Sequence, residues 1–231
     1  MRLYPLLLGV IKGPGVPIPG YLIQTGDGTN VLIDTGSPLG AAGDQPIHIG
    51  PEHDLISLLG QVGVNPGDIE YVICSHLDPD HSGNHDLFPG AEFVIQRSHY
   101  ELARSGQLPR LEVTRKQWDN PDLRYRTVDG DTELLPGIEL IESGGHVPGH
   151  QSVLVRLPNT GAILLACDAI PTADTLDPDT RALHPFDMDE PAIRASTRKL
   201  VELADRENAF IIHGHDAEQW QALPICPKYY D

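Results

Sequence analysis

The sequence predicts an α/β fold in which two sheets of strands pack against each other with helices on the outside. Short apolar runs rich in β-branched residues alternate with segments in which apolar residues recur at helical spacing, and this succession of strands followed by a helix occurs twice. No linker, low-complexity segment or fixed-period repeat interrupts the 231 residues. We therefore expect residues 1–231 to form a single domain.

The first half of the chain carries strands that surround a helix. Apolar runs predict strands over residues 3–11, 20–34, 69–74 and 91–95. Residues 37–52, which are rich in Gly and Pro, predict a loop, and apolar residues at helical spacing predict a helix over residues 53–62. A capping-box pattern predicts that a second helix begins at Ser98.

The second half repeats the pattern after an irregular, charged stretch over residues 105–125, which predicts a loop or lid. Strands are predicted over residues 124–128, 138–142, 153–157, 162–166 and 209–212. The first four are short runs separated by Gly and Asn turns, which favours antiparallel pairing. A Pro- and Asp-rich loop over residues 171–189 precedes a helix over residues 191–205, with Pro191 in its first turn.

The composition indicates a folded, strongly acidic protein. Hydrophobic residues make up 40% of the chain, and 33 acidic residues against 16 basic ones give a formal net charge of −17. A surface of this charge repels phosphate backbones and anionic lipids. We therefore expect a small-molecule substrate, with no nucleic acid and no membrane as partners.

Cysteine use and the start of the chain indicate a location inside the cell. The cysteines Cys74, Cys167 and Cys226 are odd in number and lack the spacing of a disulfide framework, which suits a reducing compartment. The apolar run at the start is interrupted by Lys12 and by residues 13–15 (GPG), too soon for a signal peptide or a membrane span. We expect a cytoplasmic protein.

Four side chains that can bind a metal lie within the segment 76–81 (HLDPDH). They are His76, Asp78, Asp80 and His81. The segment follows the predicted strand 69–74 and precedes a Ser-Gly-Asn turn, so the four side chains lie on one tight loop at the end of a core strand. Imidazole and carboxylate ligands together suit Zn, Fe, Mn or Co. Taken alone, the segment is also compatible with a polar surface loop that binds no metal.

Three further candidate ligands follow other predicted strands. They are His146, Asp168 and His215, which come after the strands at 138–142, 162–166 and 209–212. A single His at a strand end is usually an ordinary loop residue, but here the arrangement recurs at separate strand ends. If these strands share an edge, the side chains converge on one cleft. They can then hold two metal ions about 3.5–4 Å apart, with one carboxylate bridging them.

These motifs resemble the metallo-β-lactamase superfamily and, within it, are most similar to the N-acyl-homoserine lactonase family. The H-x-H-x-D-H motif of that family falls on residues 76–81, its G-H-T-P-G-H-Q-S segment on residues 145–152, its bridging Asp on Asp168 and its C-terminal G-H-D on residues 214–216. The segments 95–101, 129–137 and 227–231 also resemble the family. The resemblance extends from about Val31 to the end of the chain.

The resemblance implies an αββα sandwich of two mixed sheets with a dinuclear metal site at one edge. One ion would be bound by His76, Asp78 and His146, the other by Asp80, His81 and His215, with Asp168 bridging them. His150 and Asp34 are implied as partners that orient the ligands. The implied cofactors are two divalent metal ions, with Zn expected and Mn, Fe or Co as alternatives because of Asp78.

The chain departs from the family at Asp78, where the family has His. An additional carboxylate makes the ions weaker Lewis acids and their bound water less acidic. It also favours Mn or Fe over Zn, and it resembles the Glu at the corresponding position of flavodiiron proteins. On this charge argument, Asp78→His is expected to raise metal occupancy and rate. Alternatively, Asp78 falls short of its ion and only the second site fills.

A second departure follows Asp168. Lactonases of the family usually carry a Tyr three residues further on, which donates to the substrate carbonyl, but this chain has Pro171 there. Thr172 offers a hydroxyl nearby. Substrate walls are expected from the stretches 13–20, 37–50 and 171–188, with the apolar side chains Val16, Ile18, Leu39, Leu176 and Phe186.

The resemblance implies a metal-dependent hydrolase that opens a lactone or similar ester, and hence quorum quenching. A metal-bound hydroxide would attack the carbonyl carbon, and Asp80, as ligand and acid–base group, would pass a proton to the leaving alkoxide. Two alternatives stay open. One is a di-iron redox protein with a flavodiiron-like site, supported by Asp78 although the chain has no room for a flavin domain. The other is a non-catalytic metal-binding or sensor domain with a degenerate ligand set.

Overall fold

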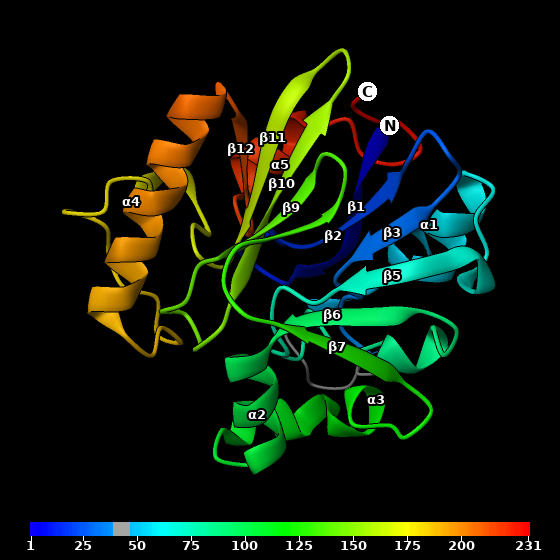
Figure 1. The fold of residues 1–231 in the computed structure, drawn as a ribbon, viewed down its shortest axis with the longest axis horizontal. Helices are drawn as coiled ribbons and strands as arrows, with labels where there is room; N and C mark the ends of the chain where they lie inside the picture. The colour runs from blue at the N-terminus through cyan, green and yellow to red at the C-terminus, as the bar shows by residue number, and fades with distance from the viewer. Residues whose placement is uncertain (39–46) are drawn as a thin grey trace.

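The two predicted sheets pack face to face with helices on their outer sides. The computed structural model describes residues 1–38 and 47–231 (Figure 1). The first sheet has seven strands in the order β4-β1-β2-β3-β5-β6-β7, and the second has five in the order β12-β11-β10-β9-β8. Helices α1, α2 and α3 pack on the first sheet and α4 packs on the second. The αββα sandwich predicted from the sequence is confirmed.

The elements have the following bounds. The first sheet comprises β1 (Arg2–Ile11), β2 (Val16–Gln24), β3 (Asn30–Ile33), β4 (Ile47–His48), β5 (Ile69–Ile73), β6 (Glu92–Gln96) and β7 (Arg124–Val128). The second comprises β8 (Thr132–Leu135), β9 (Ile138–Glu142), β10 (Gln151–Leu157), β11 (Gly161–Cys167) and β12 (Phe210–His213). The α-helices are α1 (Leu55–Gln61), α2 (Arg97–Ser105), α3 (Arg115–Trp118), α4 (Glu190–Glu207) and α5 (Ala217–Ala222). Short 3-10 helices are η1 (Pro51–His53), η2 (Pro66–Asp68), η3 (His85–Leu87), η4 (Pro109–Thr114) and η5 (Ala173–Thr175).

Strand directions bring the candidate ligands to one edge of the sandwich. In the first sheet β3 and β5 run parallel, so the loops that follow them begin at the same edge. In the second sheet β9 and β11 both pair antiparallel with β10, and β12 runs parallel to β11, so all three end at one edge. The segments after β3, β5, β9, β11 and β12 carry Asp34, residues 76–81, His146, Asp168 and His215.

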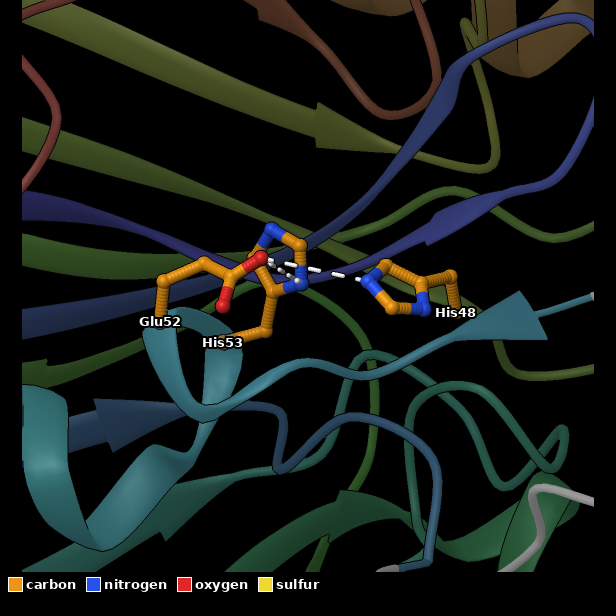
Figure 2. Close-up of side chains that lie close together, drawn as sticks. All are labelled: His48, Glu52 and His53. Atoms are coloured by element: carbon orange, nitrogen blue, oxygen red, sulfur yellow. Dashed lines mark ion pairs between the residues drawn. The ribbon is translucent and has the colours of Figure 1, made fainter.

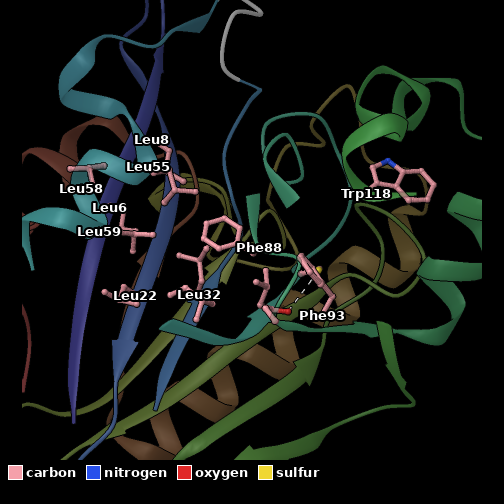
Figure 3. Packing of buried hydrophobic residues seen from close by; sticks show 14 of the residues in the cluster. Leu6, Leu8, Leu22, Leu32, Leu55, Leu58, Leu59, Phe88, Phe93 and Trp118 are labelled. Carbon is pink, nitrogen blue, oxygen red and sulfur yellow. Dashed lines mark hydrogen bonds between the residues drawn. The ribbon is translucent and has the colours of Figure 1, made fainter. Parts of the chain in front are cut away.

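Apolar side chains fill three layers of the sandwich. Between the sheets, Ile33 and Ile73 of the first sheet belong to the same buried cluster as Leu140 and Leu165 of the second. On the outer side of the first sheet, leucines of α1 pack on Leu6 and Leu22, and Phe88, Phe93 and Trp118 extend this cluster (Figure 3). On the outer side of the second sheet, α4 buries Ile193 and Leu200 on β10 and β11. Because both faces of each sheet are covered, the strands are held firmly behind the site.

Helix α4 shows how the sequence sets the ends of an element. The side chain of Asp189 accepts a hydrogen bond from the backbone N–H of Ala192, which caps the first turn. Pro191 lies in that turn, and Asn208 ends the helix in the left-handed conformation at φ 49°.

Among the described residues, no helix is both long enough and apolar enough to cross a membrane.

The structure corrects several predicted elements. Residues 105–125 contain η4 and α3 rather than an irregular loop, and the run 20–34 is divided between β2 and β3. β7 pairs with β6 in parallel, not antiparallel, because α2, η4 and α3 form a crossover between them. The helix predicted to begin at Ser98 begins at Arg97 without a side-chain cap.

Candidate metal centre

Two residues beside the candidate ligands have an unusual backbone conformation. Asp34 and Cys167 adopt positive φ values of 56° and 47°, which non-glycine residues rarely do. Both residues immediately follow or end a strand at the edge where the site lies. Such backbone strain persists where the surrounding structure overdetermines it, and it clusters at functional sites.

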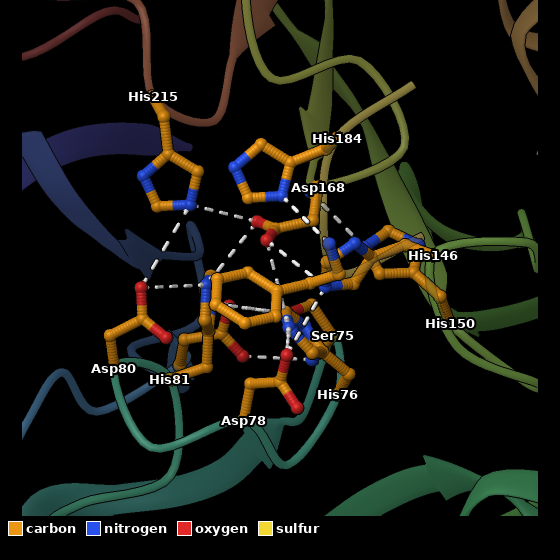
Figure 4. Close-up of polar contacts among 12 residues, drawn as sticks. Ser75, His76, Asp78, Asp80, His81, His146, His150, Asp168, His184 and His215 are labelled. Atoms are coloured by element: carbon orange, nitrogen blue, oxygen red, sulfur yellow. Dashed lines mark hydrogen bonds and ion pairs between the residues drawn. The ribbon is translucent and has the colours of Figure 1, made fainter. Parts of the chain in front are cut away.

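Two groups of potential metal ligands face each other across the carboxylate of Asp168 (Figure 4). Its Oδ2 lies 3.8 Å from Nε2 of His76 and 3.4 Å from Nε2 of His146. Its Oδ1 lies 3.3 Å from Nε2 of His81 and 3.0 Å from Nε2 of His215. The two oxygens of one carboxylate therefore face different pairs of histidines.

Aspartates of the loop after β5 complete each group. Oδ2 of Asp78 lies 3.6 Å from Nε2 of His76 and 3.2 Å from Nε2 of His146. Oδ2 of Asp80 lies 3.7 Å from Nε2 of His81 and 4.0 Å from Nε2 of His215. All seven side chains predicted from the sequence thus meet in one place, and the first group includes Asp78.

Nδ1, the ring nitrogen that faces away from the site, contacts a protein oxygen in each of these histidines. Nδ1 of His81 donates to Oδ2 of Asp34 at 2.8 Å, and Nδ1 of His215 donates to the carbonyl of Pro17 at 2.8 Å. Nδ1 of His76 lies 3.0 Å from Oγ of Ser75, which in turn donates to Asp34 at 2.6 Å. These contacts orient each ring so that its Nε2 faces the site.

His146 has a partner that the sequence did not reveal. Its Nδ1 lies 3.1 Å from Oδ1 of Asp187, which belongs to the loop between η5 and α4. The guanidinium of Arg181 lies behind this carboxylate, with 3.6 Å between Nη2 and Oδ2. His150, predicted to orient ligands, accepts the backbone N–H of Asp168 at 3.2 Å through Nε2.

The electrostatics of the site keep its carboxylates ionised. Burial raises the pKa of Asp168, but the surrounding histidines, His215 first, outweigh burial and hold that pKa well below its usual value. Burial likewise opposes ionisation of Asp78, yet the hydrogen bond from His146 and the nearby ring of His76 lower its pKa. Both groups are therefore anionic at neutral pH, as ligands for a cation must be.

The donor set fits two divalent metal ions. Nε2 of His76 and Nε2 of His81 are buried, and neither has a hydrogen-bond partner among the described residues. A buried polar atom without a partner is unfavourable by about 1–3 kcal/mol, and a bound cation would supply the missing interaction for both rings. Each group of two imidazoles and one carboxylate, with the Asp168 carboxylate between the groups, matches the ligand chemistry of such ions.

The loop between η5 and α4 lies beside the site and carries side chains that the sequence did not indicate as part of it. The ring of His184 lies 6.3 Å from that of His146, and its Nδ1 accepts the backbone N–H of Phe186 at 3.4 Å (Figure 4). Leu183, Phe186 and Met188 expose 44%, 55% and 46% of their surface. This exposed apolar surface stands beside a polar site.

The predicted substrate walls are only partly supported. Ile18 is fully buried in the core and does not line the site, and Leu39 lies outside the described residues. The hydroxyl of Thr172, which the sequence offers near the position of the absent Tyr, donates to the carboxylate of Asp174. Phe186 is a predicted wall residue with an exposed side chain, and its backbone N–H donates to His184, whose ring lies 6.3 Å from that of His146.

Another group of potential ligands, His48, Glu52 and His53, lies where η1 begins (Figure 2). Oε1 of Glu52 lies 3.9 Å from Nε2 of His48 and 3.9 Å from Nδ1 of His53. However, Nδ1 of His53 already accepts the backbone N–H of Gly50. The ring nitrogen that faces Glu52 is thus engaged, and the side chains of His48 and Glu52 are more than half exposed.

Comparisons with known proteins agree with this geometry. The model of the metallo-beta-lactamase superfamily matches residues 13–215. The N-acyl homoserine lactonase AiiA of Bacillus thuringiensis subsp. kurstaki is 32% identical over 227 residues, covering 93% of this chain and 87% of that protein. The N-acyl homoserine lactonase AttM of Azorhizobium caulinodans is 33% identical over 263 residues, covering 100% and 99%.

Solved structures extend the likeness to the whole chain. An N-acyl homoserine lactone hydrolase with the product N-hexanoyl-L-homoserine bound at its catalytic metal centre superposes with a TM-score of 0.85 at 28% identity, covering 99% of this chain and 98% of that one. A quorum-quenching N-acyl homoserine lactone lactonase superposes with a TM-score of 0.87 at 29% identity, with the same coverage. The chain therefore belongs to the metallo-β-lactamase superfamily and, within it, to the N-acyl homoserine lactonase family of metal-dependent hydrolases.

Proposed function

We propose that the protein hydrolyses N-acyl homoserine lactones by opening their lactone ring, which makes it a quorum-quenching enzyme. The observation that carries this proposal is the Asp168 carboxylate, whose two oxygens face two separate groups of ligands. The names of the relatives and the product bound in a solved neighbour support the substrate class.

We assign two divalent ions to the site, with zinc as the expected metal. His76, Asp78 and His146 would hold one ion and Asp80, His81 and His215 the other, with Asp168 between them. Four imidazoles and three carboxylates suit zinc, and the carboxylate of Asp78 keeps manganese, iron and cobalt as candidates. When bound, such ions activate a water molecule and polarise the carbonyl of an ester.

The chain's own residues then position the substrate and move the proton. Asp80 is the most exposed of the ligands, with 25% of its side-chain surface accessible, so it can reach both water and the leaving oxygen. We assign to it the transfer of a proton to the alkoxide released on ring opening. The exposed apolar side chains of the loop between η5 and α4, Leu183, Phe186 and Met188, offer a surface for the acyl chain.

The two alternative functions are not favoured. A degenerate, non-catalytic site is disfavoured because two groups, each with three ligand atoms in reach of one another, are present. A di-iron redox protein is disfavoured because the relatives that match over most of the chain are lactonases. The three buried, unpaired cysteines support a cytoplasmic location, and the sandwich supports a single domain over residues 1–231.

Proton release tests the proposal, since ring opening of a lactone yields a carboxylic acid. Protein reconstituted with Zn²⁺ is mixed with N-hexanoyl-homoserine lactone in weak buffer with a pH indicator. We expect hydrolysis that is lost on Asp80→Asn and preserved in Asp129→Asn, a surface variant that removes only an ion pair with Arg97. A protein that holds two ions but releases no proton from any acyl-homoserine lactone would refute the proposed function.

A further inference from the structure

Arg110, a residue of η4, contacts the aspartate that replaces the family's histidine. Its Nε donates to Oδ1 of Asp78 at 2.8 Å, across 32 positions of the chain. Both groups are shielded from water, with 21% of the Arg110 side chain and 8% of the Asp78 side chain exposed. Ion pairs so placed are screened far less than surface pairs.

We propose that Arg110 is a positioning residue of the metal centre, which offsets the charge of Asp78 and leaves a single oxygen of that carboxylate free to bind an ion. The inference rests on the proposed metal centre. One oxygen of Asp78 pairs with Arg110, and the other is left to bind an ion. Oδ1 accepts from Arg110, whereas Oδ2 faces the Nε2 atoms of His76 and His146. Asp78 therefore presents one ligand atom, as the family's histidine does.

The charge balance of the centre changes once Arg110 is included. Three aspartates and one hydroxide balance two divalent ions, so the ligands by themselves would give a neutral, weakly Lewis-acidic centre. The guanidinium returns one positive charge, and the centre then has the charge that a histidine at position 78 would give without Arg110. The Asp that stands in place of His is thus compensated by a residue of the segment 105–125, for which the sequence predicts a loop or lid.

Arg110 also connects this pair to the loop between η5 and α4. Its Nη1 donates to the carbonyl of Phe186 at 3.1 Å, and its guanidinium lies 5.6 Å from the centre of the Phe186 ring. Its Nη2 is buried and has no hydrogen-bond partner among the described residues. Because an unmet buried donor is destabilising, this arrangement is poorly explained as a device for stability alone.

A double-mutant cycle on metal binding tests the proposal without relying on turnover. Metal-free wild type, Arg110→Met, Asp78→His and the double variant are titrated with Zn²⁺ in competition with a chromophoric chelator, and refilled with Co²⁺ for visible absorption spectra. The controls are Arg110→Lys, which retains the cation, and Arg104→Met, which removes a surface arginine paired with Asp119 at 3.1 Å. Circular dichroism of each apo protein verifies its fold.

The predicted pattern is compensation: the two single changes shift Zn²⁺ affinity in opposite directions, and Arg110→Met alters the Co²⁺ band only when Asp78 is present. Arg110→Met alone tightens one Zn²⁺-binding step about tenfold and weakens the Co²⁺ visible band, because both oxygens of Asp78 become free to bind. Asp78→His alone weakens Zn²⁺ binding about tenfold, because it leaves the guanidinium uncompensated beside an ion. The double variant returns to within about threefold of wild type, and so do both controls.

Other outcomes overturn the inference. If Arg110→Met weakens Zn²⁺ binding in either background, or leaves it unchanged in both, Arg110 acts only as a support for the fold. If the two changes compensate as predicted but no lactone is hydrolysed, the proposed function fails and the inference about Arg110 stands. If lactones are hydrolysed and the double variant does not return to the Zn²⁺ affinity of wild type, the inference alone fails. A wild-type protein that binds no Zn²⁺ overturns both.

Discussion

Oδ1 of Asp168 lies 3.0 Å from Nε2 of His215, although 47 positions separate these residues in the chain. Its other oxygen faces His146 at 3.4 Å, so one carboxylate serves both ligand groups. We expect Asp168→Ala to remove both metal ions together and to lower lactone hydrolysis about a hundredfold or more. Elemental analysis of the dialysed variant checks this result. A variant that retains two ions would disprove the bridging role.

Asp34 tests how far the contacts behind the ligands matter. It accepts a hydrogen bond from Nδ1 of His81 at 2.8 Å and is 1% exposed. Asparagine tolerates the left-handed backbone conformation of position 34, but the Asp34→Asn variant lacks the charge that orients the ring of His81. One Zn²⁺-binding step should therefore weaken about 10–100-fold. Chelator competition measures both steps. Weakening of neither step would contradict the assignment of Asp34 to His81.

Buried His85 predicts a specific dependence of stability on pH. Burial lowers the pKa of His85 to about 3, so this ring stays neutral in the folded protein. The unfolded chain takes up a proton near pH 6.5, and the contribution of His85 to stability is therefore complete above pH 6.5 and lost as pH falls towards 3.

His85→Gln should remove this dependence. Between about pH 6 and 4, the free energy of unfolding of the variant should fall less steeply than that of the parent, by about 1.4 kcal/mol per pH unit. Urea unfolding at a series of pH values gives both slopes. Equal slopes would show that His85 does not titrate on unfolding.

Gly145, which precedes the ligand His146, is the position where a side chain is least tolerable. Its φ is +129°, and a Cβ atom there would lie 2.2 Å from the backbone nitrogen of Ile193. Gly145→Ala should destabilise the fold by about 3 kcal/mol or more and displace His146. Gly26→Ala is the matched control, because its Cβ would have no neighbour within 4 Å. Equal urea midpoints for the two variants would contradict this expectation.

The sequence was sufficient to predict that the candidate ligands meet and on which edge of the sheets they do so. Residues 76–81 are contiguous, and His146, Asp168 and His215 each follow a strand that ends at the same edge. That convergence depends only on the directions of the strands, which can be predicted from hydrophobic periodicity and from the rules of strand connection. The resemblance to lactonases then implied which residues would share an ion.

The contacts behind the ligands could not be predicted, because they depend on how distant segments pack. Arg110 lies 32 positions from Asp78, and Asp187 lies 41 positions from His146. Both belong to segments that periodicity indicated only as loops. As a result, the effect that the sequence predicts for Asp78→His neglects the guanidinium of Arg110 beside Asp78. Under the inference about Arg110, the expected effect of Asp78→His on metal binding is the reverse.

The most direct test of the centre is the metal content of the purified protein. After reconstitution with Zn²⁺ and removal of weakly held ions, elemental analysis should give two ions per chain, because two groups of three ligand atoms share the carboxylate of Asp168. A stable value of one ion or none, in protein shown to be folded, would contradict the dinuclear centre.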